Sequence, residues 1–144
     1  MDTLSTDARV LVTGGTGHSG AALVHELIAT GHPPPRIRVA FLPGTTTAAL
    51  DRLAGLELYP ADLLDPAAAW RALRDITHVF HVAGNTSFHP ARRELQWRVN
   101  VEATRNVCEA SLQSGSVERL VHTGTVNALG VPDPLGSLGD EETL

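Results

Sequence analysis

A glycine-rich segment near the start of the chain has the residue types and the spacing of a phosphate-binding loop. Its sequence is Thr13-Gly-Gly-Thr-Gly-His-Ser-Gly20, directly after an apolar run and directly before a helical pattern. Gly14 permits a tight turn, Gly17 lets the backbone approach a pyrophosphate, and Gly20 lets the helix pack on the strand. Amides at the N-terminus of such a helix face phosphates. We expect a dinucleotide to contact Gly14, Thr16, Gly17, His18, Ser19 and Gly20; the alternative is a purely structural glycine turn.

The histidines and the cysteine are not spaced as in a metal site or a nucleophilic catalytic site. None of the seven histidines has metal-ligand spacing, and His78 and His81, three apart on an expected strand, point to opposite faces. We therefore expect no metal site. Cys108 lies within an expected helix and is interpreted as a small core residue. As the single cysteine, it cannot form an internal disulfide, which fits a reducing compartment.

Apolar runs alternate with helical patterns along the chain, which indicates βαβ units that would position the glycine loop. Strands are expected at residues 9–13, 37–42, 56–59, 78–82 and 119–123, and helices at residues 19–30, 45–54, 65–74 and 94–113. The fold class is therefore α/β: a Rossmann-type, doubly wound parallel sheet of about five strands in the order 3-2-1-4-5. Ligands bind such sheets at the C-terminal strand ends, where the strand order reverses.

Length and charge exclude several classes of function. A chain of 144 residues is enough for one domain. The net charge of -5 argues against nucleic acid and against an anionic membrane surface as partners. No apolar stretch approaches the roughly 20 residues of a membrane-spanning helix, and the first eight residues lack the pattern of a signal peptide. We expect a cytoplasmic protein.

The three-residue gap between Gly14 and Gly17 resembles the TGxxGxxG motif of the short-chain dehydrogenase/reductase superfamily. Four further segments resemble that superfamily in order and spacing: Ala61-Asp-Leu-Leu-Asp-Pro66, His81-Val-Ala-Gly84, Arg98-Val-Asn-Val-Glu-Ala-Thr-Arg-Asn106 and Leu120-Val-His-Thr-Gly-Thr-Val-Asn-Ala-Leu-Gly130. The sequence is most similar to the extended branch, which includes dihydroflavonol-reductase-like members and NAD-dependent sugar epimerases and dehydratases. The resemblance covers residues 9 to 130.

The resemblance implies a role for each of these segments. Asp62, with Leu63, would contact the adenine; the alternative for Asp62 is a cap on the approach to a helix. The strand end with His81, Ala83 and Gly84 would pass beneath the nicotinamide ribose of NAD or NADP. Asn100 would be the characteristic helix asparagine, in part a structural bridge. The catalytic hydroxyl falls on Thr125, with Thr123 beside the cofactor.

The sequence also departs from the superfamily pattern. The mechanism in the superfamily uses a tyrosine with a lysine four residues later, whereas this chain has one tyrosine, Tyr59, and no lysine. Thr125 replaces the usual serine. Leu42 stands where an acid often marks NAD and an arginine often marks NADP, while Arg36 and Arg38 lie at the other end of their strand. The choice between NAD and NADP stays open.

The favoured interpretation is an N-terminal fragment of an NAD(P)-dependent reductase, epimerase or dehydratase, because the chain ends 19 residues after Thr125. Residues 1–8 would be a flexible N-terminus, residues 9–130 the NAD(P)-binding domain, and residues 131–144 an irregular acidic tail before a missing C-terminal part that would help bind a small-molecule substrate. The alternatives are a non-catalytic dinucleotide-binding sensor or regulatory module, and a structural protein that has lost its ligand. A fragment would expose an apolar edge at the fifth strand and tend to form homo-oligomers.

Overall fold

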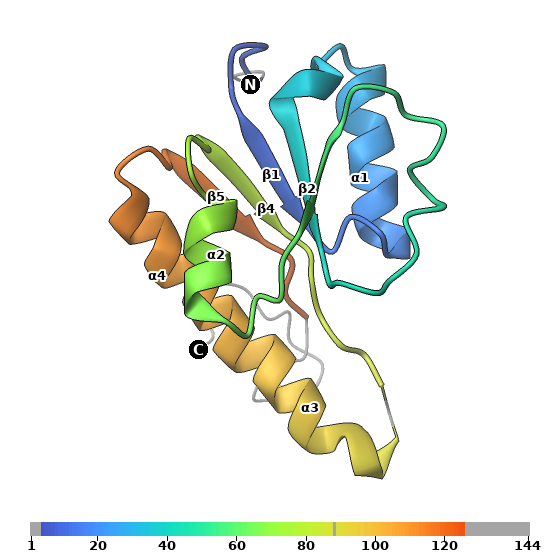
Figure 1. Ribbon diagram of the computed structural model, residues 1–144, viewed down its shortest axis with the longest axis vertical. Helices are drawn as coiled ribbons and strands as arrows, with labels where there is room; N and C mark the ends of the chain where they lie inside the picture. The colour runs from blue at the N-terminus through green and yellow to red at the C-terminus, as the bar shows by residue number, and fades with distance from the viewer. Residues whose placement is uncertain (1–3, 88, 126–144) are drawn as a thin grey trace, which may run out of the picture.

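The structure, a computed structural model, describes residues 4–87 and 89–125. Its centre is a five-stranded parallel sheet in the order β3-β2-β1-β4-β5. The strands are β1 (Val10–Thr13), β2 (Ile37–Phe41), β3 (Glu57–Pro60), β4 (His78–His81) and β5 (Arg119–His122). The predicted strands and their order are confirmed, and the order reverses between β1 and β4 (Figure 1).

Helices follow the strands as the βαβ pattern predicts. They are α1 (His18–Ala29), α2 (Pro66–Ala72), α3 (Arg93–Trp97) and α4 (Thr104–Ser114), with short 3₁₀ turns η1 (Pro34–Arg36) and η2 (Pro90–Arg92). The predicted helix over residues 94–113 is confirmed, but a π-helical turn, η3 (Arg98–Ala103), joins α3 to α4. Asp65 caps α2 by accepting a hydrogen bond of 2.9 Å from the Ala67 amide, as the Asp-Pro pair predicts.

The expected helix at residues 45–54 is wrong. This segment consists of successive turns, and its buried residue is Leu50. The Thr45 hydroxyl donates to the Leu42 carbonyl at 2.7 Å, and the Thr46 hydroxyl accepts from the Ala48 amide at 3.2 Å. Threonine hydroxyls that bond to nearby backbone groups offer the chain an alternative to a helix, and three threonines in succession favour that alternative.

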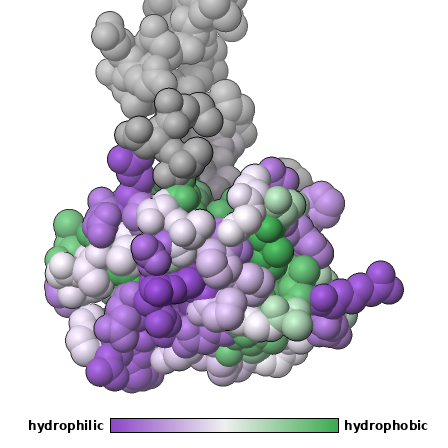
Figure 2. All heavy atoms as spheres, turned by 90° about the horizontal axis from the view of Figure 1, so that it is seen from above, coloured by the Kyte–Doolittle hydropathy of each residue, from purple (hydrophilic) through white to green (hydrophobic). Residues whose placement is uncertain are grey.

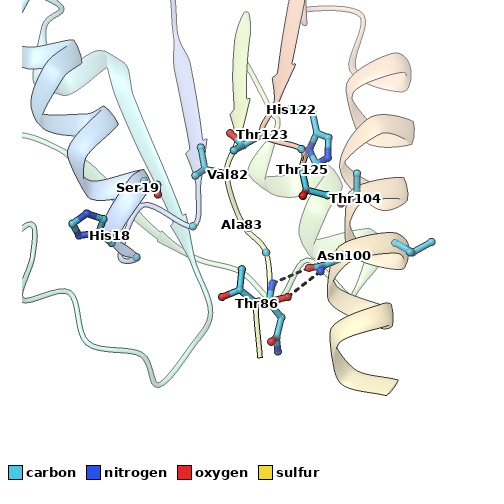
Figure 3. Close-up of a pocket in the computed structure, with 17 residues that line it drawn as sticks. His18, Ser19, Val82, Ala83, Thr86, Asn100, Thr104, His122, Thr123 and Thr125 are labelled. Atoms are coloured by element: carbon cyan, nitrogen blue, oxygen red, sulfur yellow. Dashed lines mark hydrogen bonds between the residues drawn. The ribbon is translucent and has the colours of Figure 1, made fainter. Parts of the chain in front are cut away.

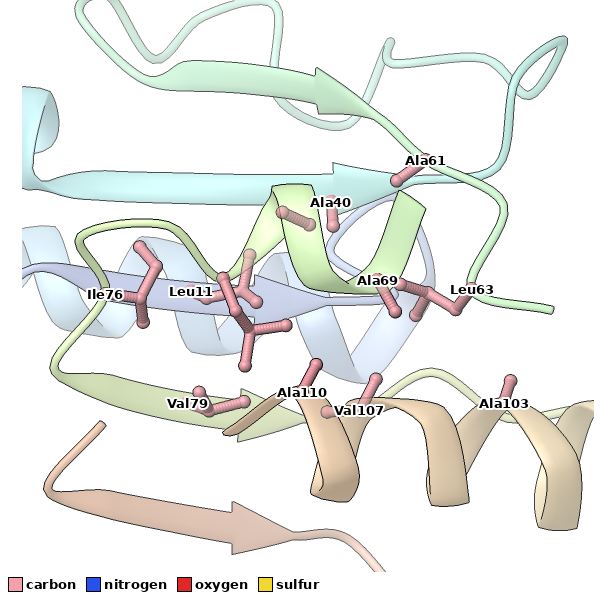
Figure 4. Close-up of a cluster of buried hydrophobic side chains, with 12 residues drawn as sticks. Leu11, Ala40, Ala61, Leu63, Ala69, Ile76, Val79, Ala103, Val107 and Ala110 are labelled. Carbon is pink, nitrogen blue, oxygen red and sulfur yellow. The ribbon is translucent and has the colours of Figure 1, made fainter. Parts of the chain in front are cut away.

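Two apolar clusters fill the two faces of the sheet. On one face, Leu11 and Val79 pack against α2 and α4 through Ala69, Val107 and other small residues (Figure 4). On the opposite face, Val10, Val12 and Val39 pack against α1. Every residue of β1 is buried, as expected for a strand covered by helices on both sides (Figure 1).

An ion-pair cluster ties the sheet together near the N-terminal ends of its strands. Glu57 accepts from Arg9 at 3.1 Å and from Arg38 at 2.8 Å. Arg38 also donates to the carbonyl groups of Ala72 and Arg74, both at 2.9 Å. The end of the molecule seen in Figure 2 is covered mainly by hydrophilic residues with smaller hydrophobic patches.

The edge of the sheet at β5 is open among the described residues. β5 pairs with β4, and its Val121 side chain is 45% exposed. This fits the apolar edge that the sequence predicts, while self-association stays a prediction. The described part of the chain contains no helix with the length and apolar character needed to cross a bilayer.

Candidate dinucleotide site

A cavity of about 810 Å³ opens at the C-terminal ends of β1, β4 and β5. One wall is the loop after β1 with the first turn of α1, and the other is formed by the ends of β4 and β5 with η3 and the start of α4 (Figure 3). The cavity therefore lies where the strand order reverses, the position predicted for a ligand in this type of sheet.

The glycine loop has the close packing that its sequence predicts. Gly14 has φ +68°, and a side chain there would place Cβ 2.7 Å from the Ala83 Cα atom. At Gly20 a Cβ would collide with the Gly14 carbonyl, so both positions require glycine for the loop to fit between β4 and α1. Gly17 is less confined, since its added Cβ would lie 3.3 Å from the Gly14 oxygen.

The N-terminus of α1 faces the cavity and has no side-chain cap. Gly17 is the cap residue and supplies no side-chain hydrogen bond, while His18, Ser19 and Gly20 line the cavity. The first amides of a helix have no partner within the helix and carry a partial positive charge. This wall of the cavity is therefore suited to an anion such as a pyrophosphate.

Beneath the opposite wall lies a buried hydrogen-bonded row. Thr13 Oγ1 lies 2.7 Å from His81 Nδ1, and His81 Nε2 lies 2.9 Å from Thr104 Oγ1. The His81 ring stacks on His122 with 5.3 Å between ring centroids. Burial of the imidazole, with a smaller contribution from His122, lowers the pKa of His81 to about 4. His81 is neutral at pH 7 and lies under the cavity, not in its lining.

Asn100 fastens the segment after β4 to the π-helical turn. Its Oδ1 accepts from the Asn85 amide at 2.7 Å, and its Nδ2 donates to the Asn85 carbonyl at 3.0 Å (Figure 3). Gln96 adds a second donor to the same carbonyl at 3.1 Å. The structural bridge considered for Asn100 is therefore present, and π-helical turns often occur at functional sites.

Most of the residues selected from the sequence meet at this cavity. Gly14, Gly17, His18, Ser19, Gly20, Ala83, Gly84, Asn100, Thr123 and Thr125 line it. Thr16, Asp62, Leu63 and His81 do not belong to the lining. Asp62 accepts from the Leu64 amide at 3.0 Å, in the capping geometry considered as its alternative, and Leu63 is buried in the core.

Sequence reasoning missed several lining residues, including Thr104 and His122. A signal for Thr104 was present, because it follows Asn100 by four positions, a spacing that places both near one helix face. His122 pairs with His81 in the register of β4 and β5, which the sequence pattern alone does not reveal. Tyr59 lies on β3 and does not line the cavity; its ring centroid is 5.1 Å from the Arg38 guanidinium carbon.

Residues 10–144 match the NAD-dependent epimerase/dehydratase family. The chain belongs to that family. The match agrees with the superfamily resemblance, the sheet order and the glycine loop. This chain therefore contains the NAD(P)-binding portion of an enzyme of this family.

Relatives with similar sequences are considerably longer than this chain. A sterol demethylase protein B from Methylococcus capsulatus is 35% identical over 134 residues, which are 93% of this chain and 39% of the relative. A dihydroflavonol 4-reductase from Zea mays is 30% identical over 145 residues, covering 96% of this chain and 40% of the relative. The chain thus spans about two fifths of their length.

A solved structure shares the fold. The UDP-glucose 4-epimerase of Thermus thermophilus, crystallised with NAD, superimposes with a TM-score of 0.75 at 32% identity. The superposition covers 94% of this chain and 43% of the epimerase.

Proposed function

We propose that the cavity binds a nicotinamide dinucleotide with its pyrophosphate at the N-terminus of α1 and its nicotinamide half against the ends of β4 and β5. The observation that carries this proposal is that two walls of different chemical character face the same cavity. The uncapped N-terminus of α1 forms one wall. The other contains Thr123, Thr125 and the clamp that Asn100 makes by bonding to the Asn85 backbone. A dinucleotide has an anionic centre and a polar end that match this arrangement.

We propose further that NAD is preferred over NADP. Leu42, which follows β2 and is 53% exposed, offers no charge to a 2′-phosphate. Arg36 donates to the Asp7 carbonyl at 3.1 Å, and Arg38 is paired with Glu57, so both are engaged at the opposite end of β2. The net charge of -5 adds a general repulsion toward the extra phosphate of NADP.

The whole enzyme, we propose, is an oxidoreductase that interconverts a secondary alcohol and a ketone on a small-molecule ring system. The names of two relatives, a sterol demethylase protein and a dihydroflavonol 4-reductase, support this class of substrate. Bound NAD would accept or supply the hydride. Thr125, at the cavity, would donate a hydrogen bond to the substrate oxygen.

This chain alone should bind the cofactor without turning over substrate. The superfamily resemblance assigns proton transfer to a tyrosine with a nearby lysine, and these 144 residues contain no lysine. Tyr59 lies against Arg38 and does not line the cavity. The second candidate is a non-catalytic sensor or regulatory module. It is favoured by the absence of lysine from these 144 residues and by the place of Tyr59 outside the cavity lining.

Titration of the chain with NADH and NADPH, followed by cofactor fluorescence, tests the binding site. Gly17→Val should weaken NADH binding by at least about tenfold, because the side chain occupies the space of the phosphate while leaving the tight contacts of Gly14 and Gly20 intact. Ala22→Val, on the exposed face of α1, is the matched control and should bind as the wild type does. Equal NADH affinity of Gly17→Val and the wild type would show that the glycine loop does not contact the dinucleotide.

A further inference from the structure

The hydrogen-bonded row beneath the cavity has a defined direction. The Thr13 hydroxyl accepts from the backbone amides of Val82 and Ala83, at 3.2 and 3.1 Å. A hydroxyl has two lone pairs and one hydrogen, so these two amides occupy both lone pairs. The hydrogen of Thr13 is then donated to His81 Nδ1, at 2.7 Å.

This direction determines the tautomer of His81. Because burial keeps the ring neutral, a ring whose Nδ1 accepts a hydrogen bond carries its one proton on Nε2. His81 Nε2 therefore donates to Thr104 Oγ1, at 2.9 Å. Backbone amides, Thr13, His81 and Thr104 form one chain in which each group donates to the next.

The hydrogen-bonded row ends on the Thr104 hydroxyl, whose hydrogen has no acceptor in the described part of the protein. Thr104 accepts from His81, and its hydroxyl makes no other hydrogen bond among the described residues. Thr104 lines the cavity, and Figure 3 shows it beside Thr125 on the wall formed by the start of α4 and the end of β5. Its hydrogen is thus available to a ligand.

We propose that His81 is a positioning residue, which orients the Thr104 hydroxyl so that it donates a hydrogen bond to an oxygen of the nicotinamide half of the bound dinucleotide. The inference rests on the proposed function. Thr104 is on the wall opposite the N-terminus of α1, so a ligand that reaches only the phosphate wall does not contact it. The Thr104 contact therefore distinguishes the two halves of the dinucleotide.

Two probes test this contact. Thr104→Val keeps the shape of the side chain and removes the hydroxyl, so NADH affinity should fall about tenfold. Binding of ADP, which lacks the nicotinamide and its ribose, should stay within about twofold of the wild type. Thr104→Ser retains the donor and should restore NADH binding. Thr30→Val, at the exposed end of α1, controls for a loss of stability caused by the same substitution.

Coupling between the two residues tests the positioning role. His81→Phe keeps an aromatic ring and removes both ring nitrogens, so it should weaken NADH binding as Thr104→Val does. The double variant should bind no more weakly than either single variant, because both act through one hydrogen bond. Fully additive losses, or equal losses for NADH and ADP, would indicate a structural role and overturn the inference.

The tautomer can be measured on the wild-type chain, which keeps the inference testable if His81→Phe does not fold. Nitrogen-15 NMR of the histidine rings should show His81 with a protonated Nε2 and a bare Nδ1. A proton on Nδ1 overturns the inference whatever the binding results. If the wild type binds neither NADH nor NADPH while His81 has the expected tautomer, the proposed function has failed and the direction of the row stands.

Discussion

At the scale of single residues, His81 makes stability depend on pH. Its pKa is lowered to about 4 in the folded chain by burial and by His122, against about 6.5 in the unfolded chain. The unfolded state therefore binds a proton more readily between these values. The contribution of neutral His81 to the free energy of unfolding is complete above pH 6.5 and is lost as the pH falls toward 4.

We expect His81 to account for a loss of about 2 to 3 kcal/mol of unfolding free energy between pH 7.5 and pH 4.5. Urea unfolding at both pH values measures it. His81→Phe, less stable at neutral pH, should show a correspondingly smaller loss on acidification. A histidine signal in NMR that titrates near pH 6.5 and belongs to His81 would contradict the expectation.

Sequence reasoning located His81 but not its position beneath the cavity. The His81-Val-Ala-Gly84 motif predicts a strand end near the ligand, and the structure places Ala83 and Gly84 in the lining of the cavity. Whether a side chain at a strand end enters the cavity or lies below it depends on the helix that covers that face. Here Thr104 of α4 stands between His81 and the opening, a tertiary relation that no local pattern encodes.

At the scale of elements, the π-helical turn holds the segment after β4 in place through Asn100. Asn100→Ala removes both hydrogen bonds to Asn85 and should cost about 1 kcal/mol of stability, because the side chain is exposed. The larger effect should be local: the Asn85 amide, released from its acceptor, should exchange with solvent about tenfold faster.

Hydrogen exchange followed by NMR measures this release. Gln96→Ala is the matched control, because it removes one hydrogen bond to the Asn85 carbonyl and leaves the Asn85 amide bonded. Unchanged exchange at Asn85 in Asn100→Ala would show that the clamp does not order this segment.

The elements themselves were predictable where hydrophobic patterning and helix signals agree. The strands and α1 follow from apolar runs bounded by glycine and proline, and α2 from its Asp-Pro start. Residues 45–54 were wrongly predicted as a helix because Gly55 suggested a helix end, whereas the threonine hydroxyls bond to the local backbone. The π-helical turn escaped prediction because apolar residues at intervals of three and four, as expected for an α-helix, continue through it.

At the scale of the whole molecule, the strand order creates the site. The chain runs outward from β1 through β2 to β3, then crosses to β4 and β5, so the loops after β1 and β4 diverge and leave a cavity between them. Alternating strands and helices with right-handed crossovers predict this arrangement from sequence. The close approach of Gly14 to Ala83, two residues that line the cavity, is visible only in the three-dimensional structure.

Mapping the amide signals of the chain in NMR as NADH is added shows whether this cavity is the dinucleotide site. We expect saturable shifts at residues 17–20, 83–85 and 123–125, all at the C-terminal ends of the strands. Amides of Arg9 and Glu118, at the opposite end of the sheet, should stay in place. Shifts centred on that opposite end, or none at saturating NADH, would show that this cavity is not the dinucleotide site.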